Sequence, residues 1–165
     1  MRRLALLAVV ACASSAPTPV PPSALRLLPQ LEAARDLDGV VVGSGTERAT
    51  VAILFATWCG ACHDEVAIVA KLRARHPGLR VLAVDYVAFE EYASRGNLEA
   101  LRAFAAATPW LRVVPADDAL FTALGRPPKI PTVYVFDRAG ALRAKMQPRQ
   151  RKGNDLDRLL STIGA

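Results

Sequence analysis

Two cysteines, Cys59 and Cys62, stand where an apolar run gives way to a helical pattern, and this junction constrains the fold more than any other feature of the chain. The apolar run over residues 51–56 is short and bounded by polar residues, which predicts a buried strand. Apolar residues then recur at helical spacing and predict a helix over Gly60–Arg75. Cys59 therefore lies at the start of a helix, with Cys62 about one turn further on, where the two sulfur atoms can form a disulfide.

The position of the two thiols predicts unequal roles. A thiolate, not a thiol, attacks a disulfide, and a helix N-terminus can lower a thiol pKa from about 8.5 to about 3.5–7.5. The cause is the set of unpaired N–H groups together with the positive end of the helix dipole. Cys59 lies in that field, so we expect it to attack, while Cys62 lies deeper and is expected to resolve the mixed disulfide.

A zinc-binding pair is an alternative interpretation of the two cysteines. Structural zinc sites usually take four protein ligands. The chain has no second C-x-x-C pair, and its only histidines are His63 and His76. The sequence therefore predicts no metal site, and His63 is expected to be an exposed helix residue.

Turn and breaker residues divide the rest of the chain into further elements. We expect a helix over residues 25–35 interrupted at Pro29, strands over 40–42 and 79–85, helices over 97–107 and 117–124, a hairpin of strands over 132–137 and 141–146, and a last helix over 154–163. Asn97 is expected to cap its helix, and Asn154 with Asp157 three residues on forms a capping-box-like arrangement. The strand, helix and strand around the cysteines imply a parallel pair with a right-handed crossover.

Taken in order, these motifs resemble those of the thioredoxin superfamily. Trp58-Cys59-Gly60-Ala61-Cys62 is similar to its W-C-x-x-C active site, and Ile130-Pro131-Thr132 with the following strand is similar to its cis-proline segment. The resemblance extends over about residues 29–163. It implies an α/β thioredoxin fold, with a central mixed β-sheet flanked by helices on both faces.

The resemblance also implies roles for residues around the cysteines. Pro131 would be cis and abut the cysteine pair, and the backbone groups of Ile130 would pair with an extended substrate segment, as in strand addition. Trp58 would cover the active site, with plain core packing as its alternative. Ile53 occupies the position at which thioredoxin carries a buried aspartate.

Within the superfamily, the approach over residues 55–59 resembles the exported TlpA/ResA/CcmG-type thiol-disulfide oxidoreductases. Glu65 matches the acidic residue of that branch, so we expect it to accept the proton of Cys62; the alternative is a solvated residue in the first turn of the helix. Ala61 and Ala67 replace prolines that are common in the branch, and this difference affects the redox potential. The connection over residues 86–96 is longer than in thioredoxin and is expected to influence partner choice.

The N-terminus has the pattern of a bacterial lipoprotein signal. A basic start and a short apolar stretch precede Val9-Val10-Ala11-Cys12, which resembles a lipobox. We therefore expect a signal peptide over residues 1–11, lipid on Cys12, a Pro/Ser-rich tether over 12–23 and a thioredoxin-like domain over 24–165. Lipidation would also use the odd cysteine and leave the redox pair alone. Cleavage after Ala13 or Ala16, giving a soluble protein, and an uncleaved anchor are the alternatives.

The charge balance gives no indication of a nucleic-acid partner. The chain has 21 Lys and Arg against 15 Asp and Glu, a net charge of +6. The excess gathers late in the chain, at Arg138, Arg143, Lys145, Arg149, Arg151 and Lys152. No aromatic residues interleave with these side chains, so they indicate a solvated face that favours anionic lipid headgroups or an acidic partner.

Together these features predict an enzyme: a lipid-anchored thiol-disulfide oxidoreductase of the bacterial cell envelope, facing the periplasm. It would reduce protein disulfides through Cys59 and Cys62 with no other cofactor. The resemblance implies electrons from a membrane donor protein and a role such as cytochrome c maturation, although a C-x-x-C pair works in either direction according to its potential. The alternatives are a copper-handling metallochaperone using Cys59, Cys62 and His63, and a non-catalytic binding domain.

Overall fold

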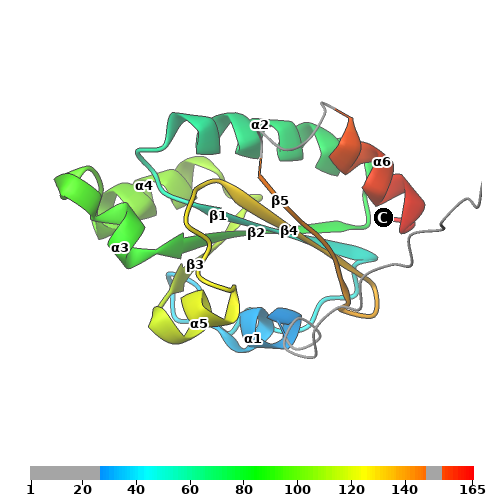
Figure 1. Cartoon of the computed structure of the whole chain (residues 1–165), viewed down its shortest axis with the longest axis horizontal. Coiled ribbons are helices and arrows are strands. Elements are labelled where there is room, and N and C mark those ends of the chain that lie inside the picture. The colour runs from blue at the N-terminus through cyan, green and yellow to red at the C-terminus, as the bar shows by residue number, and fades with distance from the viewer. Residues whose placement is uncertain (1–26, 148–153) are drawn as a thin grey trace, which may run out of the picture.

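Five strands form one mixed sheet in the order β3-β2-β1-β4-β5 (Figure 1). The computed structural model describes residues 27–147 and 154–165. The strands are β1 (Ala49–Phe55), β2 (Leu79–Tyr86), β3 (Arg112–Ala116), β4 (Thr132–Asp137) and β5 (Leu142–Met146). β1, β2 and β3 are parallel, while β4 runs antiparallel to β1 and to β5. The signal peptide, Cys12 and the tether expected from the sequence lie outside the described residues.

Helices cover both faces of this sheet (Figure 1). One face carries α2 (Gly60–Arg75), α4 (Leu98–Ala107) and α6 (Asp155–Thr162), and the other carries α1 (Leu27–Ala33) and α5 (Asp118–Ala123). The short α3 (Val87–Glu90) and a 3₁₀ turn, η2 (Tyr92–Ser94), follow β2 directly. The expected fold class is therefore confirmed. Within the described part of the chain, no helix is both long and apolar enough to span a bilayer.

The central strand β1 has a neighbouring strand on each side and helices on each face, so all seven of its residues are buried. Val51, Ile53 and Phe55 belong to the core cluster under α2, whereas Ala52 and Leu54 belong to the cluster under α1 and α5. Alternate side chains of a strand point to opposite faces. A strand buried on both faces must therefore be apolar throughout, which is why this run was recognisable in the sequence.

Two expectations about the elements were wrong, and one strand was not predicted. Residues 40–42 do not form a strand: Val41 makes one isolated bridge with Arg35, and Val40 and Val41 are exposed. Pro29 does not interrupt α1, since it is the third residue of that helix, where its missing N–H would have no partner within the helix. β3 was not predicted, because its five residues include Arg112 and Pro115; proline is tolerated there because β3 is an edge strand.

The last helix is held to the rest of the molecule by an acidic side chain rather than by a capping box. The side chain of Asn154 makes no capping hydrogen bond. Asp157, expected in the capping box, instead accepts hydrogen bonds from Arg75 and from His76 Nε2, each at 2.8 Å. These two donors stand at the C-terminal end of α2, so Asp157 ties α6 to α2. The hydrogen bond from His76 and the charge of Arg75 hold the pKa of Asp157 below its usual range.

Replacing Asp157 with asparagine is expected to lower the urea midpoint at about pH 7, because His76 and Arg75 lose their carboxylate partner. A carboxyl group with a depressed folded pKa stabilises the protein above its unfolded pKa, so wild type and Asp157→Asn should converge in acid. Asn154→Ala is the control and should stay within about 0.5 kcal/mol of wild type at about pH 7. If Asn154→Ala lowered the stability more than Asp157→Asn does, the capping box would be the correct interpretation.

Candidate active site

Cys59 and Cys62 form a disulfide at the N-terminus of α2. Their Cα atoms are 5.2 Å apart, and Cys59 is the N-cap residue with an extended backbone. The Cys62 N–H donates to Cys59 Sγ at 3.2 Å. Cys59 is 8% exposed while Cys62 is fully buried. Cys59 thus keeps a small accessible surface that Cys62 lacks, and its sulfur already receives a hydrogen bond from a backbone N–H of the first turn.

The Ile130-Pro131 bond is cis, as expected from the sequence. Thr132 opens β4 opposite Leu54 of β1, so Pro131 lies at the same end of the sheet from which the chain leaves β1 toward Cys59. Ile130 is half-buried and packs against the core cluster that contains both cysteines. The structure therefore brings the segment at residues 130–132 to the cysteine pair across about 70 residues of sequence.

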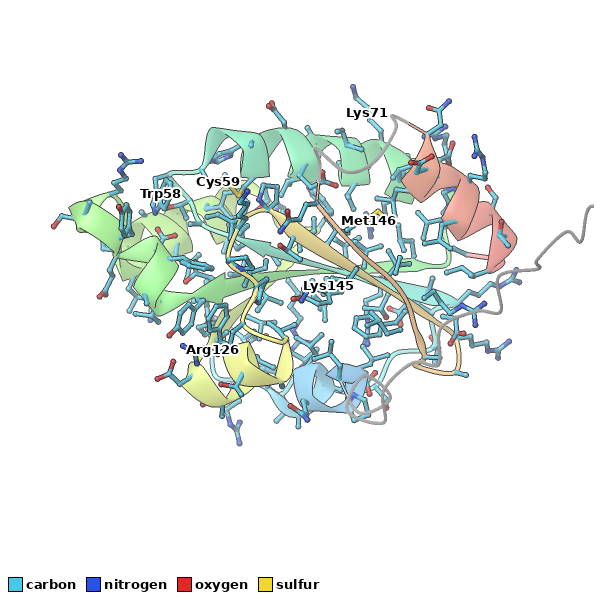
Figure 2. The ribbon with its side chains drawn as sticks, viewed as in Figure 1. Trp58, Cys59, Lys71, Arg126, Lys145 and Met146 are labelled. Atoms are coloured by element: carbon cyan, nitrogen blue, oxygen red, sulfur yellow. A yellow bond between two sulfur atoms is a disulfide. The ribbon has the colours of Figure 1, made fainter. Side chains whose placement is uncertain are left out.

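The loop before Pro131 is held at its start by two side chains of the β4–β5 hairpin. The Leu124 carbonyl oxygen accepts hydrogen bonds from the Tyr134 hydroxyl at 2.7 Å and from Lys145 Nζ at 3.2 Å. Burial raises the pKa of Tyr134 and lowers that of Lys145. Residues 125–131 therefore begin from a fixed point on the sheet, beside the labelled Lys145 in Figure 2.

Trp58 lies beside Cys59 and is half-exposed, so it is not simply a core residue (Figure 2). Its indole N–H donates to the carbonyl oxygens of Phe89 at 2.8 Å and Glu90 at 3.0 Å. The Tyr92 ring lies 6.3 Å from the Trp58 ring, and the Arg95 guanidinium lies 5.1 Å above it. The long connection after β2 thus supplies the surface on which Trp58 rests.

Glu65 is 1% exposed, which excludes the alternative that it is a solvated first-turn residue. It stands one turn after Cys62 on the buried face of α2. Ile53, at the strand position that carries an aspartate in thioredoxin, is fully buried and apolar. Glu65 is therefore a core carboxyl group one helical turn from the buried thiol.

His63 is exposed, and its Nε2–H donates to the Thr57 carbonyl oxygen at 2.6 Å. Its ring also meets the edge of Phe104, with centroids 5.6 Å apart. Within the ranges that the structure describes, no group of three or more His, Cys, Asp or Glu side chains is arranged to hold a metal ion. The contacts of His63 hold together the start of α2, the turn before it and α4.

Two buried acids near the cysteines were not predicted from the sequence. Asp85, at the end of β2, is 1% exposed and lies opposite Phe55 of β1, and Glu90 of α3 is 2% exposed. Burial, the charge and hydrogen bond of Glu90, and the charge of Glu91 raise the pKa of Asp85 to about 8. The available signal was an acid at the end of a strand over residues 79–85 that is apolar from Val81 to Val84, because a buried acid is costly unless it is paired or neutral.

The mixed sheet with helices on both faces is a thioredoxin-like fold, and it carries a disulfide-forming C-x-x-C pair at the start of α2. No family model and no curated protein matches the chain. Among solved structures, it is similar to a thioredoxin-like protein from Aeropyrum pernix, with a TM-score of 0.68, 16% identity and coverage of 83% of this chain and 93% of that one.

Two further structures with the same fold are described as disulfide-exchange proteins. One is a thiol:disulfide interchange protein from Chlorobium tepidum, with a TM-score of 0.62, 20% identity and coverage of 79% of this chain and 91% of that one. The other is a secreted Mycobacterium tuberculosis disulfide oxidoreductase homologous to E. coli DsbE, with a TM-score of 0.59, 15% identity and coverage of 78% and 93%. At these identities the similarity establishes the fold.

The raised pKa of Asp85 predicts how stability depends on pH. The unfolded chain releases this proton near the usual pKa of 3.8, whereas the folded protein keeps it until about pH 8. The folded state then binds more protons between these values, so stability falls as the pH rises through this window. The urea midpoint of wild type should be lower at about pH 8 than at about pH 5, and Asp85→Asn should flatten that slope.

Asp38→Asn, at an exposed aspartate, is the control and should keep the wild-type slope. An equal slope in wild type and Asp85→Asn would mean that Asp85 is ionised in the folded protein at neutral pH.

Proposed function

We propose that the protein is a thiol-disulfide oxidoreductase that reduces protein disulfides through Cys59 and Cys62. The observation that supports this most directly is the disulfide at the N-terminus of α2, in which Cys59 keeps 8% of its surface exposed and Cys62 is fully buried. A structural disulfide has no need of that asymmetry. An exchange pair does need it, because only one sulfur must reach the substrate.

In the first step, the Cys59 thiolate attacks one sulfur of a substrate disulfide. A bond forms between Cys59 Sγ and that sulfur, the substrate S–S bond breaks, and the second substrate sulfur leaves as a thiolate that takes up a proton. The N–H of Cys62, which reaches Cys59 Sγ at 3.2 Å, and the helix N-terminus favour the thiolate form of Cys59.

In the second step, the Cys62 thiolate attacks Cys59 Sγ. The Cys59–Cys62 bond forms, the bond from Cys59 Sγ to the attacked substrate sulfur breaks, and that sulfur leaves as a thiolate that takes up a proton. Cys62 must first lose its proton, and Glu65, buried one turn further along α2, is the group we assign to accept it. The products are a reduced substrate and the Cys59–Cys62 disulfide. A membrane electron donor protein would return the pair to the dithiol by the same exchange in reverse.

The substrate would lie as an extended segment over the surface beside Cys59. Ile130 packs against the cysteine cluster, and its backbone is the group next to the cysteines that can pair with such a segment, since Pro131 has no N–H. Trp58, half-exposed and held by the carbonyls of α3, would form the opposite wall.

We place this activity at the bacterial cell envelope, facing the periplasm, with the chain anchored through lipid on Cys12. The support is the lipobox-like Val9-Val10-Ala11-Cys12 and the secreted disulfide oxidoreductase among the similar structures. Apo-cytochrome c is the substrate that the resemblance to the TlpA/ResA/CcmG-type branch implies.

The oxidoreductase proposal is tested by trapping. Reduced Cys62→Ser, mixed with a peptide that contains a disulfide, should accumulate a mixed disulfide on Cys59, because the second attack is lost. Cys59→Ser should form none and should not reduce the peptide. Mass spectrometry without reductant measures the adduct. Trapping by both variants alike would contradict the assigned roles, and a wild-type protein that reduces no peptide would contradict the function.

The lipid anchor is tested on protein extracted from membranes. Intact-mass analysis should find a mature chain that begins at Cys12 and carries acyl mass, and Cys12→Ser should be released from the membrane. A mature chain that begins at Ser14 or Pro17 would exclude lipidation.

A further inference from the structure

The turn that carries Cys59 is held by the buried carboxyl group of Glu90. The Thr57 N–H donates to Glu90 Oε2 at 2.7 Å, and the Thr57 hydroxyl donates to Glu90 Oε1. The indole of Trp58 donates to the backbone carbonyl of the same residue. Glu90 thus binds both residues that precede Cys59, from positions 33 and 32 residues further along the sequence than Thr57 and Trp58.

Asp85 lies beside Glu90 on the face of the sheet that α2 covers. Its neighbours on alternate positions of β2, Val81 and Ala83, belong to the same core cluster as Cys59 and Cys62. Asp85 Oδ1 is buried with no hydrogen-bond partner among the described residues, and the Glu90 carboxyl is close enough to help burial raise the pKa of Asp85. Two carboxyl groups this close and this buried cannot both be ionised at little cost.

The chain is shaped to enclose Glu90. A Cβ atom at Gly96 would lie 2.1 Å from Glu90 Oε1 and 2.9 Å from the Glu90 carbonyl oxygen, so glycine is required there. Between these residues, Ala93 and Ser94 adopt positive φ angles of 53° and 57°. Residues other than glycine rarely adopt this conformation, and it is retained where the surrounding structure imposes it.

We propose that Asp85 and Glu90 form a proton-sharing carboxyl pair that positions the Thr57–Trp58 turn, and through it the attacking thiol of Cys59. The proposal rests on the oxidoreductase function above. With one shared proton, Asp85 donates to the Glu90 carboxylate, and that carboxylate accepts both hydrogen bonds of Thr57. Loss of the proton adds a second negative charge behind the cysteines, which disfavours the Cys59 thiolate. It also removes the hydrogen bond by which Asp85 donates to Glu90.

Other charged and titratable groups around this turn come from the elements packed against it. The same connection contributes the exposed Glu91 and also Arg95, which lies over Trp58, while α2 contributes His63, Glu65 and the two thiols of the reduced protein. From α4 the contact is the Phe104 ring on Phe55, since Glu99 and Arg102 are exposed. β3 faces Asp85 with Pro115, which does not titrate.

The experiment uses the reduced, full-length protein and measures the acidity of the Cys59 thiol separately from its placement. Alkylation of Cys59 by iodoacetamide between about pH 5 and pH 10 reports thiolate formation by its midpoint. The rate of reduction of a disulfide peptide at the high-pH plateau reports how well the formed thiolate is placed. Urea midpoints of every variant establish that it is folded.

We expect Asp85→Asn to lower the alkylation midpoint by about 0.5–1 pH unit, because the second negative charge can no longer form. We expect Glu90→Gln to lower the plateau rate about tenfold, since an amide offers one acceptor oxygen for the two donors of Thr57. Thr57→Val should also lower the plateau rate, without any change of charge, and Thr57→Ser should keep it near the wild-type value. Thr57→Val also serves if Glu90→Gln does not fold.

Glu91→Gln is the matched control, because it removes an exposed carboxylate from the adjacent position and leaves the contacts with Thr57 intact. It should keep the wild-type plateau rate. Equal effects of Glu90→Gln and Glu91→Gln, or wild-type profiles in Asp85→Asn and Thr57→Val, would overturn the proposal. A wild-type protein that is alkylated but reduces no peptide would instead refute the oxidoreductase function, and the shift of the alkylation midpoint would still decide whether the pair is present.

Discussion

The pairing of β1 with its two neighbours is the constraint on which the site depends. β1 leads directly into the turn that carries Cys59, so whatever lies beside its C-terminal end lies beside the cysteines. The antiparallel register with β4 brings Thr132, and with it Pro131, to that end on one side. The parallel register with β2 brings Asp85 opposite Phe55 on the other. A slip of one residue in either ladder would turn these side chains to the opposite face.

The site combines an apolar core with a small number of buried acids. The cluster around the cysteines is otherwise hydrophobic, which lowers the local dielectric and strengthens each polar contact within it. The burial of the Glu90 carboxyl is compensated by hydrogen bonds from the N–H and hydroxyl of Thr57. The burial of Asp85 raises its pKa, which favours the neutral form. The same burial that makes these groups costly to ionise makes the reactivity of a neighbouring thiol sensitive to them.

Sequence patterns located the elements that are defined by local periodicity and failed where tertiary contacts decide. The predicted bounds of α2 and the capping of α4 by Asn97 are confirmed, because both depend on residues within one or two turns. Val40 and Val41 have strand propensity, but no sheet edge meets them, so they stay exposed. Asp157 has capping spacing, but two donors at the end of α2 engage it.

The sequence by itself determined that two thiols stand one turn apart at the start of a helix, since that follows from the spacing of Cys59, Cys62 and the apolar residues around them. It also indicated the proline segment that accompanies such a pair. Only the tertiary structure decided which acids surround the thiols. Asp85 and Glu90 come to the turn through strand register and a wrapped connection, and these are non-local contacts that no local periodicity encodes.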